Sequence, residues 1–173
     1  HLHEVSLTPA PLKWFLTYIA RCTARSLIYV SDSHRVRFPI VGVPATTVHN
    51  ALDEAFLARA SVSPYSHNRD GHFKVLMLAS LRDYKGVPEF LALADRLADR
   101  TDLRFDLVLN EDESAIRRYF ETKSVSPYLT IHPRSKDPAA HYSQASLVLN
   151  LSRPDQWVET FGLTLLEAMA FGV

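Results

Sequence analysis

The chain has 173 residues, of which 47% are hydrophobic and 22% charged, and 19 basic residues balance 19 acidic ones. This composition is typical of a globular chain, and the zero net charge gives no support for nucleic-acid binding. The single cysteine, Cys22, cannot form an internal disulfide, and no apolar run reaches the roughly 18–20 residues that span a bilayer. We therefore expect a cytoplasmic α/β protein with no nucleic-acid partner.

The first 53 residues are predicted to be the end of one domain. His1 and His3 would share a strand face, but no third metal ligand is near them. Apolar residues recur at helical spacing over Pro11–Arg25, which fits packing against a sheet better than lying on a membrane surface. The remaining predicted elements are strands at 26–31 and 46–50, with one helical turn at 32–37 between them.

A polar stretch from Ser61 to Gly71 is typical of a linker, so we place a boundary segment at 54–72 and an incomplete second domain at 73–173. In that domain strands alternate with helices. Strands are predicted at 74–79, 104–109, 128–132 and 145–152, and helices at 87–100, 114–122, 138–145 and about 160–171. This alternation predicts a doubly wound parallel sheet, whose ligands bind beyond the carboxyl ends of its strands.

The stretch ETFGLTLLEAMAFG runs from Glu159 to Gly172. It follows the final predicted strand and contains the final predicted helix. The first turn of a helix has unpaired backbone N–H groups and the positive end of the helix dipole, so it suits an anion. Gly162 would let a ligand approach the backbone closely. Glu167 lies about two turns beyond Glu159, so the two carboxylates could flank such an anion and bind sugar hydroxyls. Alternatively, Glu159 only caps the helix and Glu167 is solvated.

Three other loops carry candidate residues. Arg82 and Lys85 follow the first strand of the second domain, where cations can neutralise a diphosphate, and Gly86 opens the next helix. A solvated charged loop is the alternative, and the glycine patterns of dinucleotide and P-loop sites are absent. After the next two strands, Asn110 could cap a helix or approach a base, and Arg134 could stack on a base.

Glu-x-Phe-Gly followed by Leu-Glu-Ala-Met-Ala-x-Gly, after a buried strand, resembles the signature of the retaining nucleotide-sugar glycosyltransferases of family 4. The string from Val48 to Asp53 is similar to the family's connection between two domains. The resemblance implies an α/β fold of GT-B type: a doubly wound, parallel, Rossmann-like sheet of the C-terminal donor domain, incomplete, plus the end of the N-terminal domain. Because the chain lacks an initiator Met and stops after Gly172, we expect an internal segment of a longer protein.

The same resemblance implies roles for the motif residues. Glu159 would contact the transferred sugar and Glu167 the ribose hydroxyls, while Lys85 and Arg82 would stabilise the departing diphosphate. Many relatives have Gly-Arg five residues before the lysine, where this chain has Ser80, so Arg82 would reach in from a different point. The other implied donor-binding residues are Thr160, Phe161, Gly162, Leu163, Gly86 and Arg134, and His3 is the acceptor-side candidate.

The implied activity is transfer of a sugar from a UDP-, GDP- or dTDP-sugar to a glycan or lipid-linked acceptor, with retention of configuration, in polysaccharide biosynthesis. No protein nucleophile, cofactor or metal is expected. We expect the full-length protein to be cytoplasmic and to associate peripherally with the inner face of the membrane, and the segment alone to be inactive. The alternatives are a GT-B sugar-nucleotide epimerase or phosphorylase, and a nucleotide-sugar-binding domain without catalysis.

Overall fold

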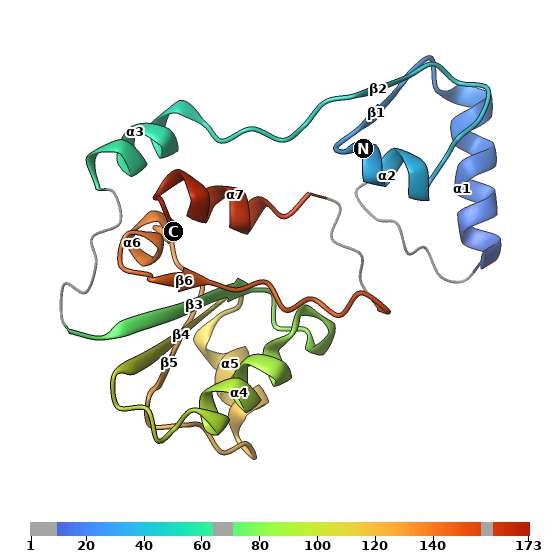
Figure 1. The fold of residues 1–173 in the computed structure, drawn as a ribbon. Coiled ribbons are helices and arrows are strands. Elements are labelled where there is room, and N and C mark those ends of the chain that lie inside the picture. The colour runs from blue at the N-terminus through green and yellow to red at the C-terminus, as the bar shows by residue number, and fades with distance from the viewer. Residues whose placement is uncertain (1–9, 64–70, 157–160) are drawn as a thin grey trace. The chain divides into compact units, whose positions relative to one another are not determined.

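The computed structural model describes residues 10–63, 71–156 and 161–173. The chain divides into two compact units, which are His1–Ala51 with Pro154–Gly162, and Leu52–Arg153 with Leu163–Val173. The elements of both units are drawn in Figure 1. The domain limits proposed from the sequence, at 53 and 73, stay predictions.

The first unit contains a pair of parallel strands, with Leu27 opposite Ala45. Its elements are α1 (Ala10–Thr23), β1 (Leu27–Tyr29), α2 (Asp32–Arg37) and β2 (Ala45–Thr47), and each confirms a predicted element, although the strands are shorter than predicted. The Tyr29 hydroxyl donates to the Phe38 carbonyl at 3.0 Å and accepts from the Ile40 amide at 3.2 Å. It therefore ties the segment after α2 to β1.

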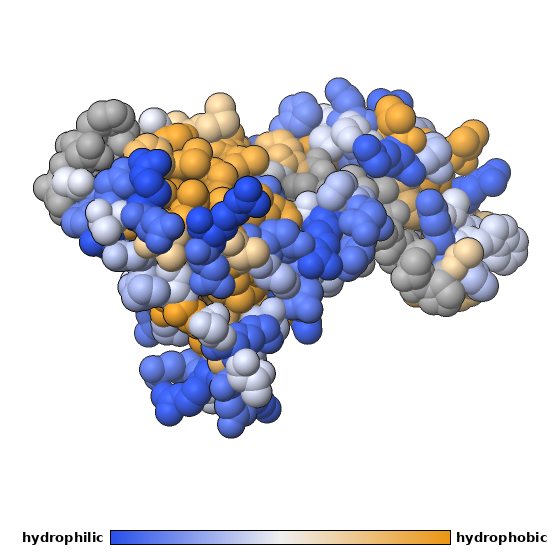
Figure 2. All heavy atoms as spheres, turned by 60° about the horizontal axis from the view of Figure 1, so that its bottom comes forward, coloured by the Kyte–Doolittle hydropathy of each residue, from blue (hydrophilic) through white to orange (hydrophobic). Residues whose placement is uncertain are grey.

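Helix α1 has many of its apolar side chains exposed. Trp14 is 71% exposed and Phe15 52%, and among the described residues none of this helix is buried. Only Leu16 and Ala20 of its apolar side are half-buried, so most of the side that was predicted to pack against a sheet is exposed. Hydrophobic groups accordingly reach the surface among hydrophilic ones (Figure 2).

The second unit is built on a parallel sheet of four described strands, in the order β5-β4-β3-β6. The strands are β3 (Phe73–Ala79), β4 (Leu103–Leu109), β5 (Leu129–His132) and β6 (Leu147–Val148). The helices are α3 (Glu54–Val62), α4 (Val87–Arg96), α5 (Glu113–Phe120), α6 (Pro138–Tyr142) and α7 (Leu163–Ala170), with a short 3-10 turn, η1 (Asp83–Lys85), before α4. The predicted alternation and parallel sheet are confirmed.

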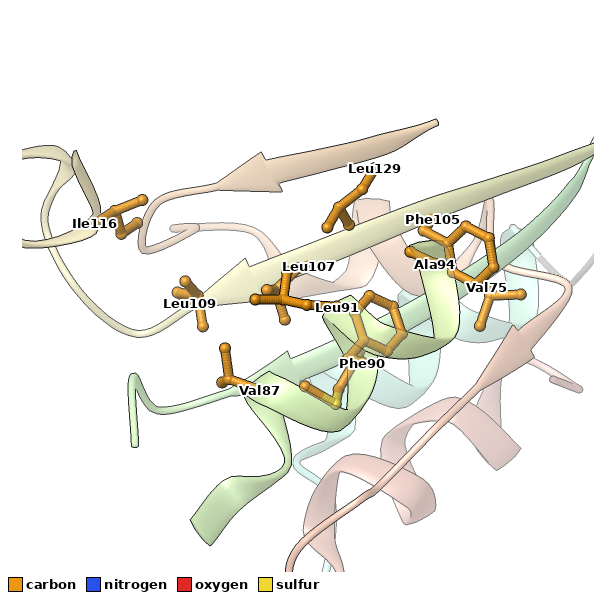
Figure 3. Close-up of a cluster of buried hydrophobic side chains, with 11 residues drawn as sticks. Val75, Val87, Phe90, Leu91, Ala94, Phe105, Leu107, Leu109, Ile116 and Leu129 are labelled. Carbon is orange, nitrogen blue, oxygen red and sulfur yellow. The ribbon is translucent and has the colours of Figure 1, made fainter. Parts of the chain in front are cut away.

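Helices cover both faces of this sheet, because side chains of successive strand residues point to opposite faces. The first layer, the α4 layer, packs α4 and α5 against one face through a cluster that includes Phe90, Phe105 and Leu107 (Figure 3). The second layer, the α7 layer, packs α3, α6 and α7 against the other face, around Tyr142 and Phe171. The sheet is therefore doubly wound, as predicted.

The ends of three helices show which residues start and stop them. Asp53 accepts from the Phe56 amide at 2.7 Å and starts α3. This helix was not predicted, because its residues were assigned to the boundary segment. Asp112 accepts from the Ala115 amide at 2.8 Å, so it caps α5, and the suggestion that Asn110 caps this helix is wrong. Gly172, with φ of 79°, stops α7 as predicted.

Candidate functional site

The turn between β3 and α4 carries the two predicted diphosphate-binding cations at the carboxyl end of β3. Lys85 ends the 3-10 turn and is half-buried, whereas Arg82 is exposed. The Lys85 amide donates to the Arg82 carbonyl at 3.0 Å, and the Arg82 amide donates to the Ser80 carbonyl at 2.7 Å. Both cations therefore lie beyond the carboxyl end of β3, as the sequence predicted, and the structure shows that they share one compact turn.

This turn is held from two sides. On one side, the Tyr119 hydroxyl of α5 donates to Asp83 Oδ1 at 2.6 Å. On the other, the Arg153 amide, which follows β6, donates to the Tyr84 carbonyl at 2.8 Å. The turn that carries Lys85 is thus fixed to the loops and helices that follow two other strands.

Gly86 has a packing role in addition to the predicted role in opening α4. Its φ is 86°, and a Cβ at this position would lie 2.3 Å from the carbonyl oxygen of Leu151 and 2.4 Å from the Leu151 Cβ. Only glycine fits such a contact without displacing backbone. The close approach of Gly86 to Leu151 therefore brings the β3–α4 turn against the segment that follows β6.

Helix α7 begins at Leu163, three residues later than predicted. Gly162 precedes it with φ of 76° and is buried, and Phe161 is half-buried, with its ring centroid 6.1 Å from that of His49. Leu163 itself is exposed. The candidates Glu159, Thr160 and His3 lie outside the described residues.

Glu167 is half-buried on α7 and already has a protein partner. The Tyr142 hydroxyl donates to its Oε2 at 2.6 Å. Tyr142 is fully buried, and this burial, together with the hydrogen bond to Glu167, raises the pKa of its hydroxyl. The hydroxyl therefore remains a donor at neutral pH and fixes one carboxylate oxygen of Glu167. This fixed orientation differs from the solvated side chain considered as an alternative.

Arg134 connects two loops at the carboxyl edge of the sheet. Its amide donates to the Glu111 carbonyl at 2.9 Å, and its Nη2 donates to the Asn110 carbonyl at 3.2 Å. These bonds join the loop after β5 to the loop after β4. The side chain is exposed, and its stacking on a nucleotide base stays a prediction.

Comparison with known proteins identifies the family of this chain. Residues 63–173 match the sequence profile of the glycosyl transferases group 1 family. The chain belongs to this family. A search of curated proteins found no match to the chain.

Solved structures similar to this group 1 glycosyltransferase chain include three glycosyltransferase-fold proteins. TarM has a TM-score of 0.68 and 14% identity over 96% of this chain, and HepE from Anabaena, in complex with UDP, has 0.70 and 18% over 99%. Sucrose-phosphate synthase from Thermosynechococcus elongatus has 0.65 and 19% over 93%. The chain covers 32%, 50% and 42% of these proteins, respectively. At such identities the likeness shows the fold, which is the α/β fold of GT-B glycosyltransferases.

The group 1 glycosyltransferase domain also contains site neighbours that sequence reasoning missed. Arg153 Nε donates to Glu89 Oε1 at 2.6 Å, and this ion pair joins the segment after β6 to α4. Tyr142 and Tyr119 are the donors to Glu167 and Asp83. Each contact joins two elements distant in sequence, so periodicity and motif spacing do not reveal it.

No group of three or more His, Cys, Asp or Glu side chains among the described residues is arranged to hold a metal ion. In the same parts of the chain, no helix has both the length and the apolar content needed to cross a membrane.

Proposed function

We propose that this chain is the nucleotide-sugar-binding part of a retaining glycosyltransferase of family 4. One observation carries the proposal. The strand order reverses between β3 and β6, since the chain continues from β3 to β4 and β5 and then returns to the other side of β3. Ligands of open parallel sheets bind at such a switch point, beyond the carboxyl ends of the strands. The Lys85 turn follows β3 there, and the segment leading to α7 follows β6.

The side chains proposed to bind the donor have the chemistry that a nucleotide-sugar requires. Lys85 and Arg82 would neutralise the diphosphate and stabilise it as it leaves. Glu167, with one oxygen fixed by Tyr142, can use its other oxygen to accept hydrogen bonds from ribose hydroxyls. The complex of HepE with UDP supports a nucleoside diphosphate donor.

The remaining donor contacts are proposed from the resemblance. Glu159 would bind hydroxyls of the transferred sugar. Amides at the start of α7 would bind the sugar and phosphate, since a helix N-terminus favours an anion. The residues involved would be Thr160, Phe161, Gly162 and Leu163, with Gly86 and Arg134 completing the site. The leaving phosphate would help to deprotonate the acceptor, so that configuration is retained without a protein nucleophile.

The decisive test is an assay of the complete protein with UDP-, GDP- and dTDP-sugars, preceded by calorimetric screening for the donor that binds. Transfer to an acceptor with retained anomeric configuration is expected. Conversion of the donor without transfer would instead identify an epimerase, and binding without reaction would identify an inactive binding domain. The 173-residue chain alone should bind a nucleoside diphosphate weakly and transfer nothing.

Substitution of Lys85 tests the site itself. Lys85→Ala should lower turnover by about 10²–10³-fold, the usual loss when one electrostatic stabiliser of a developing anion is removed. Lys74→Ala is the matched control, because Lys74 lies at the amino end of β3, whereas the Lys85 turn follows the carboxyl end of this strand. Glu159→Gln should also lower turnover strongly. Near-normal rates from both Lys85→Ala and Glu159→Gln would remove the site assignment.

We also propose that the protein is cytoplasmic and associates with the inner face of the membrane through α1, where it would meet a glycan or lipid-linked acceptor. Trp14 and Tyr18 are 71% and 56% exposed and stacked at 5.8 Å, and Arg21 falls on the same side of the helix. Residues 10–51 contain one acidic residue, Asp32, and five basic residues, which are Lys13, Arg21, Arg25, Arg35 and Arg37. Aromatic and basic side chains together favour the surface of an anionic bilayer.

Vesicle flotation tests this membrane contact. The protein should float with vesicles of phosphatidylglycerol and phosphatidylcholine and much less with phosphatidylcholine alone. Replacing Trp14 and Tyr18 with alanine should reduce flotation, whereas replacing the exposed Val62 of α3 should not. Equal flotation of all three proteins would contradict the role of α1.

A further inference from the structure

Tyr119 connects α5 to the turn that carries Lys85. Its hydroxyl donates to Asp83 Oδ1 at 2.6 Å, across 36 positions of sequence. Burial, and the neighbouring Asp83 carboxylate, raise the pKa of this hydroxyl, so it stays protonated and remains a donor at neutral pH.

The Tyr119 side chain is itself held in place. Its ring packs against the hydrophobic cluster of the α4 layer and meets the Phe120 ring edge to face, with centroids 5.0 Å apart. The Lys123 ammonium lies 3.7 Å from the centre of the Tyr119 ring and donates to the Tyr119 carbonyl at 3.0 Å. A side chain with its ring restrained in this way can impose its position on a partner.

Asp83 is the first residue of the 3-10 turn, two residues before Lys85. The Asp83 carbonyl accepts from the Gly86 amide at 3.0 Å, so the carboxylate and the carbonyl of one residue are both fixed. The opposite side of the turn is held by a backbone bond, from the Arg153 amide to the Tyr84 carbonyl. Tyr119 thus supplies the side-chain half of a two-sided attachment.

We infer that Tyr119 is a positioning residue for Lys85, acting through Asp83 without touching the donor. This inference rests on the proposed function of Lys85 in binding a diphosphate. Because binding groups must be held within about 0.5 Å of the productive geometry, a mobile turn would weaken binding even with Lys85 present. Loss of the Tyr119 hydroxyl should therefore act on the affinity for the nucleoside diphosphate.

The variant Tyr119→Phe keeps the packed ring and removes only the hydrogen bond. Amide hydrogen exchange of the complete protein, without ligand, should show faster exchange in residues 82–86, while the far-UV circular dichroism stays unchanged. Asp83→Ala should reproduce this effect, whereas Asp83→Asn should retain most of the protection, because its amide oxygen still accepts a hydrogen bond. Tyr128→Phe is the control for the chemical change, since Tyr128 precedes β5 at the opposite edge of the sheet.

The same variants are then titrated with UDP, GDP and dTDP. Tyr119→Phe should weaken binding of the preferred nucleotide by about three- to tenfold, the equivalent of one intramolecular hydrogen bond. In the transfer assay it should raise KM for the donor more than it lowers kcat. The double variant Tyr119→Phe, Asp83→Ala should bind no more weakly than Asp83→Ala alone, because the two residues act through one bond.

Unchanged exchange in residues 82–86 of Tyr119→Phe would overturn the inference, whatever the titrations show. Faster exchange with unchanged nucleotide affinity would overturn it as well, provided that Lys85→Ala weakens binding. If Lys85→Ala itself binds the nucleotide normally, the proposed function fails instead, and the exchange measurement still decides whether Tyr119 orders the turn.

Discussion

The two helical layers of the second unit are held together in different ways. The α4 layer has an apolar centre, where the fully buried Phe90 meets Phe105 with ring centroids 5.8 Å apart. The α7 layer is also aromatic at its centre, where Tyr142 stacks on Phe171 at 6.0 Å, but its aromatic cluster ends in a hydroxyl bound to Glu167. Among the described residues, the buried centre of the first layer is held by apolar packing alone, whereas the buried centre of the second layer also makes a hydrogen bond to an ionisable side chain.

This difference matters for the site, because each layer supports one of its charged residues. The α4 layer carries the Lys85 turn, through Tyr119 and the close fit at Gly86. The α7 layer carries Glu167, through the buried Tyr142. The two cations proposed to bind a diphosphate and the carboxylate proposed to bind ribose hydroxyls are thus stabilised by separate packing arrangements. Substitutions in one layer should leave the charged residue of the other layer in place.

The largest effect on stability should come from Gly86→Ala. A methyl group there would meet Leu151 backbone at 2.3 Å and would also be strained at a φ of 86°. We expect the free energy of unfolding to fall by about 2–5 kcal/mol, combining left-handed strain with overpacking. Urea unfolding, followed by circular dichroism, measures this loss.

Gly172→Ala is the matched control in the α7 layer. Gly172 has a similar φ of 79°, but nothing lies within 4 Å of an added Cβ. It should therefore lose only the strain, about 1–2 kcal/mol. If Gly86→Ala cost no more than Gly172→Ala, the contact with Leu151 would not be the reason for glycine at position 86.

A smaller effect is expected from Tyr142→Phe, which removes a hydrogen bond between a buried hydroxyl and Glu167. We expect a loss of about 1.5–3 kcal/mol, the range for hydrogen bonds to charged groups. Tyr119→Phe, in the α4 layer, should cost about 1 kcal/mol or less, because Asp83 is exposed. Chemical unfolding of both variants gives the comparison, and equal losses would argue against the difference between the layers.

The sequence predicted the sheet and most of the helices of both layers. Residues such as Val75, Met77 and Leu107 lie in continuous apolar strands, and Phe90, Leu91 and Ala94 recur at helical spacing, so local pattern alone identifies these elements. Helix α3 was missed because its residues were assigned to the boundary segment, although it is longer than the predicted helices α5 and α7. The role of Asp112 as the N-cap of α5 was also missed. Asn110, two residues earlier, has a side-chain oxygen that can accept the same kind of hydrogen bond.

The site could be predicted only in part. The strand–loop–helix pattern placed Lys85 and Arg82 at the carboxyl edge of the sheet, because that position follows from order along the chain. The partners of Glu167, Asp83 and Arg153 could not be predicted, since these contacts join positions 25, 36 and 64 residues apart. Such pairs depend on which strands are neighbours, and the sequence pattern does not specify the strand order.

The smallest predicted effect concerns pH and is confined to the α7 layer. His141 on α6 is half-buried, and this burial, together with His132 at 5.0 Å between ring centroids, lowers the pKa of its imidazole. The carboxylates of Asp106 and Asp137 oppose the shift, and Asp137 is paired with Arg59 at 2.7 Å. The neutral imidazole is therefore the form that the folded layer favours.

Because the folded pKa of His141 lies below its unfolded value of 6.5, the unfolded chain binds more protons as the pH falls through this window. The contribution of His141 to stability is thus complete above pH 6.5 and is lost at lower pH. Between pH 7.5 and 5.5, the free energy of unfolding should decrease more steeply for the wild-type protein than for His141→Asn. Urea unfolding at the two pH values measures both slopes. Parallel slopes would show that the α7 layer is as insensitive to this titration as the apolar α4 layer, and that the difference between the layers is one of packing alone.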